Sequence, residues 1–249
     1  MTILDRNSGT STTTGLTTWP VTRSSGSFGT GTTLVVMFVG NVTFSTPSGW
    51  TLRASSVSSQ GLYIFDKVAA GETTINFTSG VAGGCQWYAW ELSAGAAWLG
   101  GQAQELAAAA TVPLPSITPS AGNRHMLGVA GANAIGNPQS VTAFDNGYTR
   151  WGGAQTQTGD WILSAAADRD VAANGSTAYT STATLSANIG PRAALHAAYT
   201  DTATVDTSPP SIPTGLTAVN VGATTADLSW VAATDDVGVT GYQVQIVGP

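Results

Sequence analysis

The shortage of charged side chains is the feature that most constrains what this chain can fold into. Charged residues make up only 9% of its 249 residues, and Lys67 is the only lysine, whereas globular proteins carry about 25% charged residues. A surface helix needs Glu, Lys and Arg on its outward face. The abundant Thr, Val and aromatic residues instead favour pleated, half-buried strands. We therefore expect an all-β protein.

Apolar runs of strand length recur along the chain, separated by Gly, Pro, Asn and Ser. We expect strands at 33–39, 50–52, 61–68, 73–78, 86–92, 125–130, 148–151, 161–167, 179–185 and 192–199. Short strands in this rhythm predict a sandwich or a barrel rather than alternating strands and helices. The run at 33–39 is apolar almost throughout, which indicates a strand buried on both faces.

Composition divides the chain into four parts. Residues 1–25 are rich in Thr, Ser and Gly and predict an extended N-terminal arm or a first edge strand. Because this arm is too polar to form a core, we expect it to pack against a neighbouring copy of the chain, in a symmetric oligomer such as a trimer. Residues 26–205 are expected to form a β-sandwich. Three prolines within 206–213 predict a semi-rigid linker, and residues 214–249 form a second unit.

The charge balance and the N-terminus exclude several partners and locations. The net charge is −6, and the few basic residues are scattered, so we expect no nucleic-acid partner. The first residues lack the basic and apolar regions of a signal peptide, and no apolar run reaches the ~18 residues of a membrane span. We expect a soluble protein that is made in the cytoplasm, does not insert into membranes, and either works there or leaves the cell by assembly or lysis.

Few residues offer metal or nucleophilic chemistry. The two histidines, His125 and His196, lie far apart in Ala-rich strand segments, without the closely spaced ligands that zinc requires. Cys85 is the only cysteine and lies in an apolar strand, where a small buried hydrophobic role is expected. We predict no metal and no cofactor.

Asp168 and Asp170 are the best carboxylate pair. Their i, i+2 spacing would place both on one face of a strand, and a glycosidase needs two carboxyl groups about 5 to 9.5 Å apart. However, Arg169 between them and the residues 171–175 that follow indicate an exposed loop. Catalysis or calcium binding at this pair is therefore the weaker interpretation, and we expect no catalytic site.

The eight tryptophans have two possible uses. Tryptophan is the largest core residue, and when exposed it can stack on sugar rings or be covered by a neighbouring subunit. We assign Trp50, Trp90 and Trp230 to cores. We expect surface positions for the tryptophans beside Gly or Pro, namely Trp19, Trp98 and Trp151.

The C-terminal unit resembles the start of a fibronectin type III domain of the bacterial kind. The resemblance is carried by Pro213, Leu216, the segment 228–230, the loop 233–239 and the segment 242–244. It implies a partial immunoglobulin-like unit, because such a domain has seven strands and this chain reaches three. A spacer or adhesion role is what the resemblance implies.

The first unit resembles a β-sandwich domain found in phage minor tail and other virion proteins. The matching segments are 31–39, 46–52, 61–69 and 90–93. The resemblance implies a jelly-roll-like β-sandwich with an architectural or host-adhesion role, and it brings no catalytic residues.

These observations favour a bacteriophage virion structural protein, in the minor tail, the tail tip or a head fibre or decoration. Its expected partners are other virion proteins and copies of itself, and a host cell-surface glycan is a further candidate. We expect the N-terminal sandwich to anchor the protein to the particle and the C-terminal unit to point outward. The alternative is a carbohydrate-binding module of a secreted bacterial protein, and a third class, a glycoside hydrolase, has only Asp168 and Asp170 in its favour.

Overall fold

The computed structural model describes residues 3–58, 60–120, 122–132, 140–152, 163–174, 177–200, 209–222, 224–234, 239 and 241–245. The strands are β1 (Ile3–Thr22), β2 (Thr33–Gly40), β3 (Thr51–Val57), β4 (Gly61–Val68), β5 (Thr74–Leu92), β6 (Trp98–Leu106), β7 (Ala109–Pro113), β8 (Gly122–Ala132), β9 (Val141–Phe144), β10 (Thr149–Trp151), β11 (Leu163–Asn174), β12 (Thr182–Ile189), β13 (Arg192–Thr200), β14 (Thr214–Val219) and β15 (Asp227–Val231). No helix occurs among these described residues, so none there is suited to cross a membrane.

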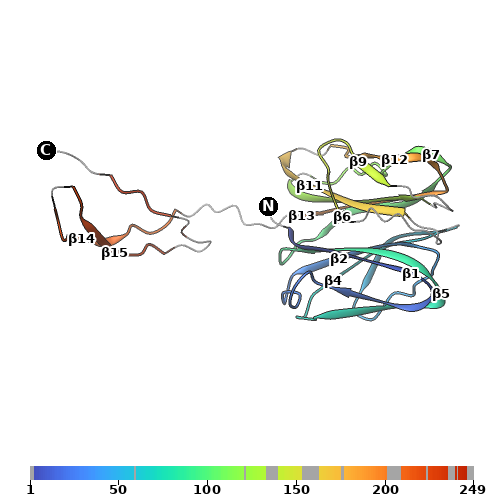
Figure 1. Ribbon diagram of the computed structural model, residues 1–249, viewed down its shortest axis with the longest axis horizontal. Coiled ribbons are helices and arrows are strands. Elements are labelled where there is room, and N and C mark those ends of the chain that lie inside the picture. Colours follow the sequence, from blue (N-terminus) through green and yellow to red (C-terminus); the bar gives the residue numbers. More distant parts are fainter. Residues whose placement is uncertain are drawn as a thin grey trace. The chain divides into compact units, whose positions relative to one another are not determined.

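Two five-stranded antiparallel sheets form a sandwich (Figure 1). The first sheet has the order β1-β5-β2-β4-β3 and the second has the order β10-β11-β8-β13-β6. The chain therefore completes the first sheet before it begins the second. The expectation of an all-β chain with a β-sandwich is confirmed.

A third, three-stranded sheet, β7-β12-β9, covers the outer face of the second sheet. The second sheet is thus covered on both faces, and its strands carry many alanines, as in β13, where all but the last residue are buried. One apolar core lies between the first and second sheets and another between the second and third. Strand β2 is likewise buried along its whole length, as its continuous apolar run predicts.

The first sheet is covered on its outer face by its own longest strands. Asn7 donates a hydrogen bond to the Thr22 carbonyl at 2.9 Å, and the Ser24 amide donates to Asp5 at 2.9 Å, so the two ends of β1 lie side by side. The β1–β5 register shifts between Ser11 and Thr18. The paired strands therefore bend there and fold back across the sheet, and they enclose a third, aromatic core.

The N-terminal residues are consequently part of the sandwich. β1 pairs with β5 of the same chain along most of its length, and Trp19 is only 1% exposed. The Trp19 ring packs edge-on against Phe44 at 5.2 Å between ring centroids. The assignment of Trp19 to the surface is wrong, and of the two alternatives for residues 1–25 the structure shows the edge strand. Trp50 and Trp90 are buried, as expected.

The chain divides into two compact units, Met1–Ala203 and Thr204–Pro249. The second unit contains the antiparallel hairpin β14–β15. Residues 206–208 of the expected linker lie outside the described residues, and residues 209–213 are described without helix or strand. Trp230 is only half-buried and packs edge-on against Tyr242 at 5.2 Å, so its assignment to a closed core is wrong for the described part of this unit.

Candidate functional site

Asp168 and Asp170 lie within a strand rather than in a loop. β11 continues without interruption to Asn174, between β10 and β8. The alternation of the strand directs both carboxylates to the face that meets the first sheet. The expected exposed loop at this position is wrong, because pairing with β8 continues through Val171. The i, i+2 spacing therefore does bring the two carboxylates to one face.

Asp168 joins the two large sheets. Its two carboxylate oxygens accept hydrogen bonds from Arg6 Nε at 2.6 Å and from Arg6 Nη2 at 2.8 Å, a bidentate pair of the strong kind. The indole N–H of Trp90 donates a third bond at 3.0 Å. Arg6 lies on β1 and Trp90 on β5, so a buried carboxylate of the second sheet is held by two side chains of the first.

Asp170 is the more exposed of the two carboxylates. Its Oδ1 lies 2.6 Å from Nδ1 of the buried His125 on β8, and its side chain is 35% exposed. The hydrogen bond from His125 is the main cause that lowers the pKa of Asp170 below its ordinary value. Asp170 is therefore held as a carboxylate near neutral pH, which a general acid would not be.

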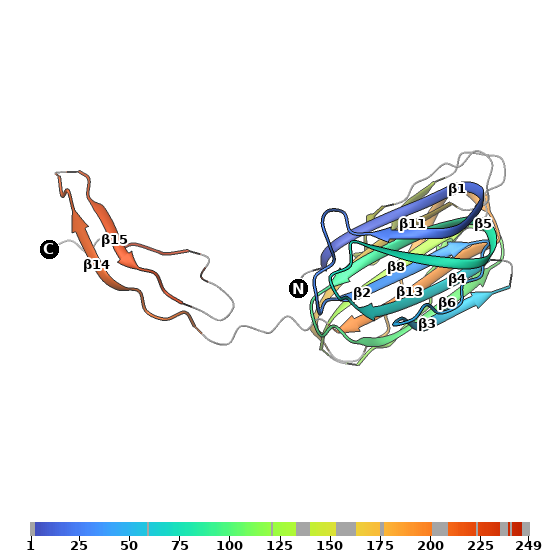
Figure 2. The ribbon, with the colours of Figure 1, turned by 90° about the horizontal axis from the view of Figure 1, so that it is seen from below.

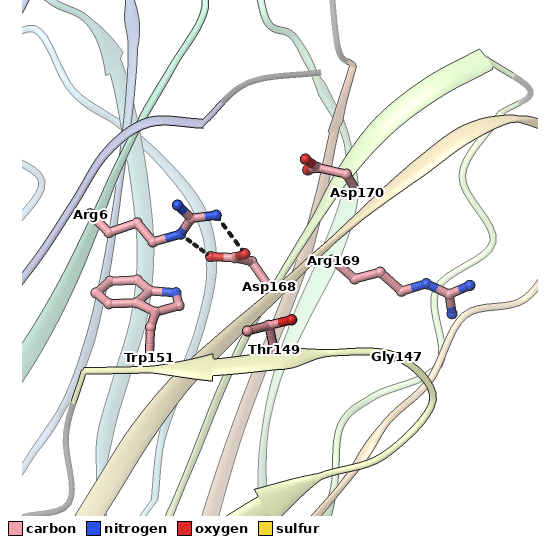
Figure 3. A pocket seen from close by; sticks show the side chains of 7 residues that line it. All are labelled: Arg6, Gly147, Thr149, Trp151, Asp168, Arg169 and Asp170. Carbon is pink, nitrogen blue, oxygen red and sulfur yellow. Dashed lines mark hydrogen bonds and ion pairs between the residues drawn. The ribbon is translucent and has the colours of Figure 1, made fainter.

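A hollow of about 450 Å³ opens beside these side chains (Figure 3). Its lining comes from β1, from β11, from β10 and from the turn before β10, and it consists of Arg6, Gly147, Thr149, Trp151, Asp168, Arg169 and Asp170. Asn146 and Gly147 both have positive φ, 54° and 76° respectively. They form a tight turn that directs the short strand β10 along the hollow. Figure 2 shows β1 and β11 together along this open side of the sandwich.

The other open side carries a second set of the same kinds of side chain. Arg53 Nε donates to Asp66 at 2.7 Å, and the Tyr199 hydroxyl donates to the same carboxylate at 3.0 Å. Trp98 packs edge-on against Tyr199 and lies under the Arg53 guanidinium. Each open side thus combines an Arg–Asp pair, an aromatic donor to the carboxylate and a half-buried tryptophan. Sequence reasoning missed Arg6, whose partner is set by the stacking of the two large sheets, and Arg53, whose partner is set by the register between β3 and β4.

The remaining candidate residues have structural roles. His196 is buried, and its Nδ1 lies 2.6 Å from the Pro115 carbonyl while Tyr148 donates its hydroxyl hydrogen bond to Nε2 at 2.6 Å. Burial lowers the pKa of His196 to about 4, so the ring is neutral at pH 7. Cys85 is buried, and burial raises the pKa of its thiol well above the ordinary value, which disfavours a nucleophile.

The carboxylates of Asp168 and Asp170 are both engaged by neighbouring side chains. Both oxygens of Asp168 are occupied by Arg6. Within the part of the chain that the structure describes, no group of three or more His, Cys, Asp or Glu side chains is placed to hold a metal ion. What the open side offers is a hollow with fixed donors and acceptors of both charges.

Comparison with known proteins gives short matches only. Over 44 residues, 18% of this chain, the sequence is 54% identical to chitinase Chi52 of Paenibacillus xylanexedens. It is also 56% identical over 43 residues to exoglucanase B of Cellulomonas fimi and 60% identical over 35 residues to exoglucanase A of the same organism. These matches span 8%, 4% and 4% of the three proteins, respectively. No protein family and no solved structure matches the chain significantly.

Proposed function

We propose that this chain is a structural protein of a bacteriophage particle, without catalytic activity, which carries its first unit as an anchor and its second as a spacer or adhesion element. The segments that resemble virion sandwich domains form β2, the turn into β3, β4 and the end of β5. They thus build the central part of the first sheet, on which the rest of the sandwich is stacked.

The observation that carries this proposal is the pairing of buried polar side chains within the sandwich and at its two open sides. Ion pairs join Arg6 to Asp168 and Arg53 to Asp66, and the Tyr88 hydroxyl lies 2.9 Å from Ser164 Oγ across the two large sheets. Buried polar groups that are fully paired rigidify a core and fix its arrangement. This use suits a stable scaffold better than an enzyme, whose polar groups must be available to a substrate.

The short matches are in keeping with a shared accessory segment. Their lengths of 35 to 44 residues suit the C-terminal unit, Thr204–Pro249, and we infer that they fall there. Segments of this size cover only a small part of the chitinase and the exoglucanases, so we carry no activity over from them.

Particle composition tests the proposal. Phage particles are induced from the host, purified on a density gradient and analysed by mass spectrometry, and antibodies against the first unit are located on them by immunogold electron microscopy. We expect the chain among the particle proteins, with gold at one defined place on the particle. Its absence from infectious particles would refute the virion role.

A second function is favoured by the names of the matched proteins. A chitinase and two exoglucanases share a segment with this chain, which supports the alternative of a carbohydrate-binding module in a secreted bacterial protein. Retention of the purified chain on insoluble chitin or cellulose, together with its absence from particles, would favour this alternative.

A further inference from the structure

Two hollows adjoin at the end of β11. The hollow beside Asp168 and Asp170, of about 450 Å³, shares Gly147 and Arg169 with a second one of about 410 Å³. The second is also lined by Asn146, Ala178, Tyr179 and Thr180. Together they form a polar groove that passes over the turn before β10, with Trp151 in one half and Tyr179 in the other. We call this the β10 groove.

The β10 groove is electrically balanced. Arg6 is paired with Asp168, and the Arg169 guanidinium points away from Asp170, toward Asn146 and Tyr179 in the second hollow (Figure 3). Two anionic side chains and Arg6 therefore face the hollow beside β11, and the Arg169 guanidinium faces the adjoining one, so that the groove as a whole holds two charges of each sign. A phosphate or a carboxylate ligand would meet Asp168 and Asp170, and a metal cation would meet Arg6 and Arg169. A neutral ligand avoids the repulsion that either kind of charged ligand would meet in the groove.

The groove presents hydrogen-bonding groups in fixed positions. Arg169 donates to the Asn146 carbonyl at 2.7 Å and lies over the Tyr179 ring at 5.9 Å, while His125 holds Asp170. The exposed Thr149 hydroxyl can both donate and accept. Groups held in this way bind with little loss of conformational freedom. Their alternation of donor and acceptor matches a row of hydroxyl groups.

Trp151 adds an apolar surface and an unused donor. Its ring packs edge-on against Trp90 at 5.0 Å, which fixes its orientation, and it remains half-exposed beside the groove (Figure 3). Its indole N–H is buried and has no hydrogen-bond partner among the described residues. Tryptophan with one apolar face and one polar edge suits a ligand that has both kinds of surface.

From these features we infer that the β10 groove binds a neutral oligosaccharide. The C–H faces of a sugar ring would lie against an aromatic side chain, and its hydroxyl groups would pair with Thr149, Arg169 and Asp170. A wholly apolar ligand would leave these polar groups unpaired. The inference rests on the proposed function in one respect, because the particle role supplies the reason for a glycan partner.

Binding of the purified full chain to a printed array of neutral and acidic oligosaccharides tests this inference, followed by titration of the best neutral probe. We expect neutral oligosaccharides to bind. Asp170→Asn and Arg169→Ala should each weaken binding by about tenfold or more, as expected for a lost hydrogen bond to a charged group. Thr149→Val, which conserves volume at an exposed position, should weaken it in the same direction.

The chain contains matched controls for the two charged positions. Lys67 lies over the Trp50 ring at 5.8 Å and pairs with Glu72, so Lys67→Ala and Glu72→Gln remove an equivalent cation and carboxylate away from the groove. Both controls should bind like the parent chain. Thermal melting of every variant shows whether a loss of binding accompanies a loss of fold. If the charged-residue variants are unstable, the binding of the folded Thr149→Val variant decides whether the groove is the binding site.

Three outcomes would overturn the inference: no binding on the array, binding of acidic glycans only, or neutral binding that survives all three groove substitutions. Failure on the array while the chain is still found in particles would remove the glycan site and leave the virion role. Binding on the array by a chain that is absent from particles would support the glycan site and remove the virion role.

Discussion

Truncating Asp168 to alanine would remove the acceptor of three hydrogen bonds that join the two large sheets. The Trp90 ring is fully buried, so its N–H would lose its partner without reaching water, at a cost of about 1–3 kcal/mol. The Arg6 side chain is 37% exposed and can regain water. Its share should therefore be near the surface value of about 1 kcal/mol rather than the roughly 3–5 kcal/mol of a buried pair. Together the terms predict a loss of about 3 kcal/mol in the free energy of unfolding.

Urea unfolding followed by tryptophan fluorescence measures this loss. The midpoint should fall while the dependence of the free energy on urea stays unchanged. The melting temperature should fall by about 6–12 °C, at about 2–4 °C per kcal/mol for a unit of this size. Arg6→Ala and the double variant complete a cycle, in which we expect a coupling energy of about 1 kcal/mol or more. A loss below about 1 kcal/mol, or strictly additive effects, would refute the cross-linking role of this pair.

Trp19→Ala should destabilise the isolated chain by about 3–5 kcal/mol, independently of protein concentration; a concentration-dependent effect would instead place Trp19 in a contact between copies. The free energy of unfolding should fall by about 3 kcal/mol between pH 6.5 and 4. Over this range His196 becomes protonated in the unfolded chain, whereas in the folded chain its pKa is lowered to about 4 and the ring stays mostly neutral. His196→Gln should lose that part of the pH dependence, and an unchanged pH profile would argue against a buried neutral ring. Gly61→Ala should cost about 1–3 kcal/mol, since a Cβ there would lie 2.0 Å from the Val42 carbonyl oxygen, whereas Gly80→Ala meets nothing within 4 Å and should change stability by less than about 0.5 kcal/mol in a melting experiment.

Local composition was sufficient to predict the class of fold. The lack of charged residues excludes surface helices, and the apolar run at 33–39 becomes β2, whose residues are all buried. Trp90 lies in an apolar strand segment and Trp50 at the end of a turn before β3, and both are buried in the cores to which they were assigned. These predictions succeed because strand formation and burial on both faces depend on the pattern of residue types at neighbouring positions.

Tertiary structure alone decided the roles of Trp19 and Asp168. Trp19 is surrounded by polar residues and precedes Pro20, so its local sequence indicates exposure, yet β1 folds back and places the ring against Phe44. Asp168 stands in a charged stretch that reads as a loop, and its partner Arg6 lies 162 positions away. Partners this distant are brought together by the stacking of sheets. The sequence by itself therefore determined which segments are strands, and only the packing of those strands decided which polar side chains meet at the open side of the sandwich.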